Sequence, residues 1–406
     1  MDRLRAAGGG RVVSVSTLIE MARRIFDFIS SLKLTIVCLA AAMVLVFVGT
    51  LAQVNFGIHE VQQRYFQSLI VWWPAGSQGL RIPVFPGGHL LGAVLLVNLI
   101  AAHLRRFRWS WSKLGIHLTH AGLIILLAGG LFTDLFSVES FMRLAPGESK
   151  NYSEDSRAIE LAVIDGTDAE VEQVTAIPEA RLRQGGMIED SSLPFRIAVR
   201  KFFQNSQVQP LEAAGKNAEP AATQGAGSRV AVSELPRATA ENQRDMASAV
   251  IEMVPDGGQA PGQPPGTWLV SSHFDAPQTF SCAGKSWRLA MRPARYYKPF
   301  SLTLRKFTHE RYPGTEIAKN FASSVALVDP ERNESRDVLI YMNHPLRYRG
   351  ETFFQSGFDG DDSILQVVYN PGFIAPYLAC VLVGVGLLVQ LTWHFSGFLR
   401  RRNPAQ

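Results

Sequence analysis

Four long apolar stretches limit most strongly what this chain can fold into. They cover roughly residues 34–54, 89–104, 115–135 and 373–395. Because a helix needs about 20 apolar residues to cross a bilayer, each stretch predicts a transmembrane helix. A cleaved signal peptide is the alternative for the first stretch, but that stretch begins late and lacks a small-residue cleavage site. The sequence therefore predicts a membrane protein with three helices near its start and a fourth near its end.

Lysine and arginine residues predict how these helices are oriented. Basic residues crowd the segment 1–33, the turn 105–114 and the tail 396–406, whereas the loop 55–88 holds only Arg64 and Arg81. Short segments rich in Lys and Arg stay on the cytoplasmic side of a membrane. We therefore expect a multi-pass protein of the cytoplasmic (inner) membrane whose termini and turn are cytoplasmic and whose first loop lies outside.

The long segment 136–372, between the third and fourth helices, is predicted to be an extracytoplasmic all-β domain. Short runs rich in β-branched and aromatic residues recur in it, with turn residues between them. Antiparallel strands packed as a sandwich or a barrel bury such runs. The predicted strands are residues 159–165, 195–203, 248–254, 286–292, 301–307, 323–329, 337–343, 351–358 and 364–370.

Other parts of this segment predict less regular structure. Residues 209–228 and 256–266 are rich in Ala, Gly, Pro and Gln and predict loose loops that tolerate shortening. Residues 239–249 carry a weak helical pattern, and residues 343–350, which include Pro345, predict the turn of a β-hairpin.

Charge and cysteine content exclude several classes of protein. A net charge of +5 over 406 residues is small and unevenly spread, which gives no support to nucleic-acid binding. The three cysteines form neither a CxxC nor a CxxCH motif. The chain therefore lacks both a thioredoxin-like pair and a covalent haem attachment site of its own. Cys282 is expected to be a free thiol in the core of the outer domain.

Three histidines lie at the predicted cytoplasmic ends of two neighbouring helices. His103 ends the second helix, and His117 and His120 begin the third. The turn between the helices is short, so the three imidazoles should lie at one membrane depth, with His117 and His120 on one helix face. Ionisable groups at such a depth are costly and usually face a bundle interior, which favours a function. The alternative is structural, with each ring capping the hairpin or bonding to a backbone carbonyl.

Haem is the ligand that suits this setting best. A zinc site needs three or four ligands and no acid or cysteine lies nearby, while a proton relay would need further polar groups along the span. Haem is apolar with polar propionates and takes axial imidazoles, so His103, His117 and His120 are candidate iron ligands. Arg105, Arg106 and Lys113 could then hold the propionates. Small residues in the third helix would admit either a macrocycle or another helix.

Several stretches of the helices and of the outer domain have a distinctive sequence. Those of the helices are "SSLKLTIVCLAAAMVLVFVGTLAQ", "NLIAAHLRR" and "GIHLTHAGLIILLAGG". Those of the outer domain are "YPGTEIAKNFASSVALVD" and "VLIYMNHPLRYRGETFFQSGF", the latter followed by "ILQVVYNPG" and the fourth helix. These stretches resemble the ResB-like family of cytochrome c biogenesis proteins, and the resemblance extends over roughly residues 31–395.

The resemblance implies a place in the System II pathway. ResB-like proteins pair there with a ResC/CcsA-type membrane protein, carry haem across the membrane, and support its attachment to the CxxCH motif of apocytochrome c. It implies haem b as a transiently bound cofactor, shared with a histidine of the partner, and a thioredoxin-like reductant as a further partner. The chain would then be a non-catalytic or co-catalytic subunit of a cytochrome c haem lyase.

Two other readings stay open. In one, the chain is a membrane scaffold whose outer domain binds apocytochrome c or its reductant, and all haem ligands belong to the partner. In the other, it is a receptor-like sensor, although no cytoplasmic effector domain is apparent in the sequence. The outer histidines His59, His89, His273, His309 and His344 are expected to be solvated or hydrogen-bonded rather than functional.

Overall fold

The computed structural model describes most of the chain and divides it into two compact units. The described residues are 15–73, 82–168, 171–215, 218–238, 243–255, 266–311, 313–314 and 318–402. One unit, here called the helical unit, consists of Met1–Ser137 with Asn370–Gln406. The other, here called the β unit, is Val138–Tyr369.

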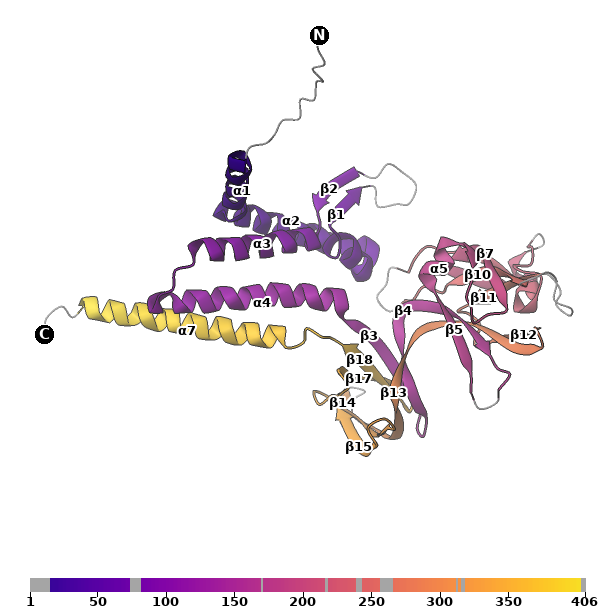
Figure 1. Cartoon of the computed structure of the whole chain (residues 1–406). Helices are drawn as coiled ribbons and strands as arrows, with labels where there is room; N and C mark the ends of the chain where they lie inside the picture. The colour runs from indigo at the N-terminus through magenta and orange to yellow at the C-terminus, as the bar shows by residue number, and fades with distance from the viewer. Residues whose placement is uncertain are drawn as a thin grey trace, which may run out of the picture. The chain divides into compact units, whose positions relative to one another are not determined.

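The helical unit contains the apolar helices that the sequence predicts (Figure 1). Four of its helical segments are long and apolar enough to cross a membrane, which confirms the predicted number within the described residues. Its elements are α1 (Val15–Ile29), α2 (Leu32–Val61), η1 (Gln62–Phe66), β1 (Ile70–Trp73), β2 (Ile82–Pro86), α3 (Gly88–Arg106), η2 (Trp111–Lys113), α4 (Leu114–Phe136) and α7 (Ala375–Arg402). Helix α1 is an addition that the sequence analysis did not predict. Helix α2 and η1 also continue well into the segment predicted as a loop.

Helices α4 and α7 pack against each other through a row of glycines. Gly115, Gly122 and Gly129 are buried and spaced by seven residues, so they lie on one face of α4. A Cβ atom at Gly115 would come within 2.5 Å of the Gly386 carbonyl oxygen, and one at Gly122 within 2.7 Å of Val383. Small residues allow such close contact between membrane helices. These three glycines therefore admit a helix, and not a macrocycle.

A buried asparagine joins α1, α2 and α3. The Asn98 side chain on α3 is almost completely buried. Its amide nitrogen donates to the carbonyl oxygens of Ile29 (2.5 Å) and Ser31 (3.1 Å), at the junction between α1 and α2. Its amide oxygen accepts from Thr35 Oγ1 at 2.6 Å. Because every polar atom of the amide has a partner, the residue is stable inside an apolar helix pair.

The β unit is built from antiparallel strands, as predicted, and adds short helices. The strands are β3 (Val138–Leu144), β4 (Ser149–Asp165), β5 (Gln173–Pro178), β6 (Gly186–Ile188), β7 (Phe195–Phe203), β8 (Ser206–Pro210), β9 (Val230–Glu234), β10 (Ser248–Pro255), β11 (Thr267–Ser271), β12 (Gln278–Cys282), β13 (Lys285–Arg311), β14 (Ala318–Asp329), β15 (Glu334–Tyr341), β16 (Leu346–Tyr348), β17 (Glu351–Asp359) and β18 (Asp362–Tyr369). The helices are α5 (Glu179–Gln184), α6 (Leu211–Ala214) and η3 (Gly225–Arg229). The domain is therefore β-rich, not strictly all-β.

Two hydrophobic cores share the long strand β13. The main sheet runs β15-β14-β13-β4-β3-β18-β17-β16, and a smaller sheet runs β11-β10-β7-β6. The first core lies between the smaller sheet and β4, β5, β12 and the first half of β13. The second is enclosed by β3, the second half of β13, and β14 to β18. Strand β15 contacts β16 and β17, so this half of the sheet closes nearly into a barrel.

The loose-loop prediction for residues 209–228 is wrong. This segment contains α6 and most of η3, and Ala222 and Gly227 within it are buried. The Ala226 amide donates to Gln278 Oε1 at 2.9 Å. Composition misled the prediction, because small residues here allow close packing: a Cβ atom at Gly227 would lie 2.8 Å from Leu269. Of the second predicted loop, only Gly266 is among the described residues.

Two smaller predictions also have outcomes. The weak helix at residues 239–249 is wrong where the chain is described, because residues 243–247 are irregular and Ser248 begins β10. Cys282 is a free, buried thiol as expected. Burial raises the pKa of this thiol above its ordinary value, which keeps it protonated and unreactive.

Candidate functional site

The three predicted histidines of the helical unit come together at one end of the α3–α4 hairpin. The ring centroid of His103 lies 5.2 Å from that of His117 and 5.5 Å from that of His120. The rings of His103 and His120 are stacked, whereas His117 meets His103 edge-on. The last turn of α3 and the first turns of α4 supply them, because η2 closes the hairpin after a few extended residues.

Hydrogen bonds define which nitrogen of two of these rings carries the proton. His120 Nδ1 lies 2.8 Å from the carbonyl oxygen of Ile116, one turn earlier in α4. His117 Nε2 lies 3.2 Å from the carbonyl oxygen of Arg108. A carbonyl oxygen can only accept, so each of these nitrogens must donate. In the neutral rings, the lone pair is therefore on His120 Nε2 and on His117 Nδ1.

One of these lone pairs is buried without a partner. His117 Nδ1 has no hydrogen-bond partner among the described residues and is shielded from solvent. Aromatic rings lie around it. The ring centroid of Phe107 is 4.8 Å from that of His117, and the Trp109 ring lies parallel to the His117 ring with a centroid distance of 6.3 Å. A buried acceptor without a donor is costly, and such an atom points to a ligand that is not part of the chain.

The basic residues of the predicted site have different surroundings. Arg105 forms an ion pair with Asp27 (3.0 Å) and donates to Ser30 Oγ (2.9 Å), so its guanidinium is directed to α1. Arg106 and Lys113 are exposed and form no ion pair with any residue that the structure describes. Of the three cations proposed for the propionates, these two are the ones available to an anionic group.

The cluster does not have the geometry of a protein-only metal site. No group of three or more His, Cys, Asp or Glu side chains among the described residues could hold a metal ion. The arrangement offers individual imidazole lone pairs beside flat aromatic rings. It suits an iron whose other ligands come from a macrocycle, which needs only one or two imidazoles.

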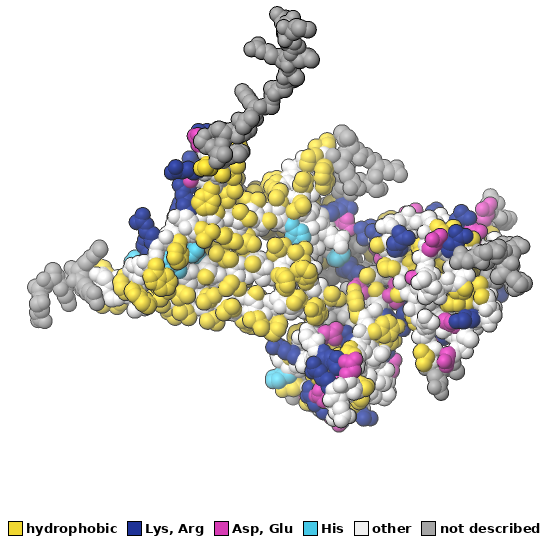
Figure 2. Space-filling view, in the orientation of Figure 1, with side chains coloured by type: hydrophobic (Ala, Val, Ile, Leu, Met, Phe, Trp, Pro, Cys, Tyr) yellow, Lys and Arg dark blue, Asp and Glu magenta, His cyan; other side chains and the backbone are white. Residues whose placement is uncertain are grey.

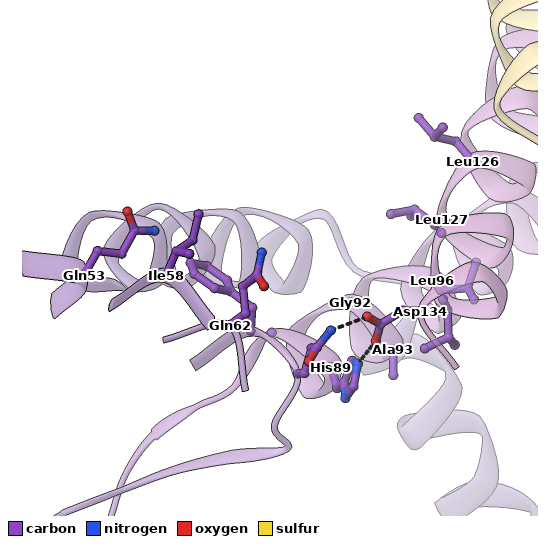
Figure 3. Close-up of a pocket in the computed structure, with 15 residues that line it drawn as sticks. Gln53, Ile58, Gln62, His89, Gly92, Ala93, Leu96, Leu126, Leu127 and Asp134 are labelled. Atoms are coloured by element: carbon purple, nitrogen blue, oxygen red, sulfur yellow. Dashed lines mark hydrogen bonds and ion pairs between the residues drawn. The ribbon is translucent and has the colours of Figure 1, made fainter. Parts of the chain in front are cut away.

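A second polar cluster lies at the other ends of the same helices. Asp134 of α4 pairs with His89 Nε2 of α3 and accepts from Gln67 Nε2 at 2.7 Å (Figure 3). These residues line a cavity of about 560 Å³ whose other walls are mostly apolar, and Gly92 and Gly130 leave it room. His89 and His103 are separated by fourteen residues of α3, or about 21 Å along the helix.

Sequence analysis did not single out Asp134. The signal was present, because an acid within an apolar helix is itself unusual. His89 was expected to be an ordinary hydrogen-bonded histidine, and its partner is this acid. The histidines of the β unit have structural surroundings: His273 Nε2 donates to the Ser206 carbonyl oxygen, His309 packs on Phe321 and Phe358, and His344 stacks on Tyr341.

Comparison with known proteins finds two partial similarities. Residues 278–364 match the model of the ResB-like family. A stretch of 112 residues is 39% identical to Protein NrfI of Wolinella succinogenes. Both matches support a likeness to the ResB-like family over part of the chain. The family match extends from β12 to the first residues of β18.

The comparisons cover only part of each protein. The similarity to Protein NrfI extends over 27% of this chain and 12% of that protein. The family match lies within the β unit and does not reach the helices that carry the histidine cluster. The likeness to the ResB-like family therefore concerns the β unit, and the histidine site has to be argued from its own geometry.

Proposed function

We propose that this chain is a ResB-like protein, that it takes part in cytochrome c biogenesis, and that it binds haem at the cluster of His103, His117 and His120. In this proposal the chain is an integral membrane protein of the cytoplasmic membrane and works with a ResC/CcsA-type partner. The pair moves haem b as cargo from the cytoplasmic side and supports its attachment to apocytochrome c. The family assignment supports the pathway, and the geometry of the cluster supports the cargo.

One observation carries the haem assignment. His120 donates its Nδ1–H to a backbone carbonyl in its own helix, which leaves the Nε2 lone pair free. Histidines that bind metals usually donate their second ring N–H in this way, because the bond fixes the tautomer and orients the ring. Nε2 is also the ring nitrogen farther from the backbone, so a flat macrocycle could approach it. We therefore assign His120 Nε2 as the axial ligand.

The neighbouring residues have supporting roles in this proposal. The lone pair of His117 is on Nδ1, next to the Cβ atom, where a macrocycle would meet the main chain. His117 is therefore the weaker ligand, and a water molecule or a propionic acid group could donate to it. His103 stacks on His120 and restricts its ring. Arg106 and Lys113 lie nearby without ion pairs and are suited to hold propionates by charge-assisted bonds.

The direction of transport follows from the proposed orientation. The basic turn between α3 and α4 would face the cytoplasm, and the β unit would face the outside. Haem made inside the cell would then meet the histidine cluster first. Protease added to spheroplasts should digest the β unit and spare the turn at residues 105–114, and cleavage of the turn would contradict this orientation.

Single alanine variants of the three histidines test the haem site. The protein would be purified together with its partner, and the haem content and the Soret maximum measured. His120→Ala should lose most of the bound haem, and added imidazole should restore it by filling the vacated ligand position. His117→Ala should keep its haem, and its Soret maximum should shift less from that of the wild type than the maximum of His120→Ala does. His59→Ala, at the other end of the helices, is the matched control and should behave as the wild type.

The outcome separates the two functional hypotheses. Normal haem content and normal cytochrome c maturation in all three variants would favour the scaffold, in which the partner holds every haem ligand. Loss of haem in His120→Ala without rescue by imidazole, together with loss of thermal stability, would instead indicate a structural role for the ring.

A further inference from the structure

Helix α1 has a polar face and an apolar face, and much of the apolar face is exposed in the described chain. Its charged residues, Glu20, Arg23, Arg24 and Asp27, follow the spacing i, i+3, i+4, i+7 and therefore lie on one side of the helix. The other half of the helix carries large apolar residues that are exposed, with Ile25 and Phe26 nearer its centre and Ile19 and Phe28 at its two edges. The exposed fractions are 65% for Ile19, 52% for Ile25, 41% for Phe26 and 65% for Phe28.

The direction of α1 is set by specific contacts at its C-terminal end. The Ile29 carbonyl oxygen accepts from the buried Asn98 of α3, and Arg105 holds both Asp27 and Ser30. Ser31 caps the next helix, since its hydroxyl accepts from the Leu34 amide at 3.3 Å. The helix therefore leaves α2 at a defined turn and runs across the direction of α2 and α3 (Figure 1). It does not continue the membrane-spanning helix.

These contacts also place α1 at the depth where the spans end. Arg105 belongs to the last turn of α3, at the basic end of the hairpin. Trp109 and Trp111 follow in the same turn and are 65% and 70% exposed. Exposed tryptophans beside basic residues are typical of the boundary between headgroups and acyl chains. A helix that lies crosswise at this depth runs along the membrane surface.

The two faces of α1 point in the directions that a membrane surface requires. In Figure 2 the Lys and Arg atoms of α1 lie on its side away from the long helices. Its apolar atoms adjoin the apolar surface of those helices. Only 11–17% of the residues in the apolar windows of the spans are buried within the protein, so most of that apolar surface is available to lipid.

The charges favour an anionic leaflet. Both acids of α1 already have partners, since Glu20 pairs with Arg24 and Asp27 with Arg105. Arg23 forms no ion pair with any described residue, and neither do Arg106 and Lys113 at the α3–α4 turn. The unpaired charge at this end of the unit is therefore positive, which attracts anionic lipid headgroups.

We propose that α1 is an interfacial helix that lies on the membrane surface at the basic end of the spans. Its apolar face is buried among the upper acyl carbons, and Arg23 with the basic turn contacts anionic headgroups. The helix thereby holds the α3–α4 turn, which carries the histidine cluster, at the headgroup level. The proposal does not depend on haem binding.

Photo-crosslinking in nanodiscs of phosphatidylcholine and phosphatidylglycerol tests this directly. The full-length chain would carry p-benzoylphenylalanine in place of Phe26 or Phe28, which preserves an aromatic ring at either position. Phe132 on α4, an exposed apolar residue of a span, is the positive control, and Arg24 on the polar face is the matched negative control. Mass spectrometry of the peptides would identify lipid adducts and their headgroups.

The expected result is lipid adducts at residues 26 and 28 with yields close to that at residue 132 and several-fold above that at residue 24. Phosphatidylglycerol should be enriched in the adducts, and Arg23→Gln should reduce that enrichment without abolishing the adducts. Equal yields at residues 24 and 26 would overturn the proposal. So would adducts at residues 26 and 28 that consist of protein, in the chain alone or with its partner, because α1 would then be a protein-docking helix.

Discussion

The β unit buries its large apolar side chains inside, whereas the helical unit exposes most of them on its surface. In the β unit, large residues such as Phe195 and Phe353 are at most 1% exposed and fill two cores. In the helical unit, residues such as Phe47 on α2 are 65% exposed, and few positions of the spans are buried. Water drives burial in the first unit. Lipid removes that driving force in the second, where close contacts and buried polar bonds have to supply the specificity.

This difference predicts that truncation of a large aromatic side chain matters in one unit only. Phe353→Ala should reduce the free energy of unfolding of the β unit by about 3–5 kcal/mol, because it leaves a cavity in the second core. Phe47→Ala removes a side chain of the same size from a lipid-facing position and should change stability far less. Thermal unfolding of both variants in nanodiscs, followed by the β-sheet circular dichroism signal, measures the effect. Equal shifts in the two variants would contradict the comparison.

A second prediction concerns the glycine contacts that replace a core in the helical unit. Gly122→Leu should separate α4 from α7 and cost about 1–3 kcal/mol or more, because its Cβ atom already approaches Val383 and the Ala379 carbonyl oxygen. Gly130→Leu is the matched control in the same helix, since a Cβ atom there meets nothing within 4 Å. Thermal stability in detergent, scored by retention of a monodisperse chromatographic peak, distinguishes them. Similar losses of thermal stability in both variants would mean that helix propensity and lipid contacts cause the loss, and not the packing of α4 on α7.

The third prediction tests the buried polar junction. Asn98→Ala removes the amide donor from the carbonyl oxygens of Ile29 and Ser31, and leaves that of Ser31 with the Thr35 hydroxyl at 3.5 Å, at a cost of about 1–3 kcal/mol. The junction between α1 and α2 should then open more often, and trypsin should cleave near Arg24 and Lys33 faster than in the wild type. Thr50→Ala removes an exposed hydroxyl that bonds only within its own helix and serves as control. An unchanged cleavage rate would mean that α1 is held by other contacts.

The smallest expected effect is the loss of stability at low pH when an ion pair at the edge of the first core is broken. The Lys285 ammonium donates to Asp165 at 2.7 Å, and together with Thr167 it lowers the pKa of that carboxyl to about 2. A carboxyl whose pKa is depressed on folding stabilises the folded state above its ordinary pKa near 3.8. That contribution is lost as the pH falls through about 2. The difference in melting temperature between wild type and Lys285→Gln should therefore shrink between about pH 4 and pH 2. A constant difference over that range would show that the pair contributes through packing.

Local patterns explain why so much of the fold could be predicted. A span is recognised from the hydropathy of its own residues, and α3 and α4 begin and end within a few residues of their predicted bounds. Strand β7 coincides with the predicted run, since its β-branched and aromatic residues lie within a single segment. The pattern of α1 was equally local and was overlooked because its arginines were read only as an orientation signal. The segment 209–228 was misjudged because composition does not report what small residues pack against.

For the candidate site, too, the sequence predicted one part and the structure supplied the other. The sequence predicted that His103, His117 and His120 share one depth, because a short turn leaves antiparallel helices little freedom. The sequence did not indicate which of the three histidines would be the iron ligand. The bond from His120 to Ile116 and the unpartnered nitrogen of His117 distinguish them, and both depend on side-chain directions that no spacing rule contains. Likewise, Arg105 was one of three equivalent cations until the structure paired it with Asp27.

What the sequence determined by itself is therefore the number of long apolar helices, the β character of the large domain and the hairpin that gathers the histidines. Each depends on periodicity or composition within one segment. Only the tertiary structure decided that the glycines of α4 face α7, that Asn98 ties α1 to the spans, and that Asp134 meets His89 and Gln67. These contacts join residues far apart in the chain. Their partners are selected by how whole elements pack, because hydrogen bonds and van der Waals contacts act over a few ångströms in space, whatever the separation along the sequence.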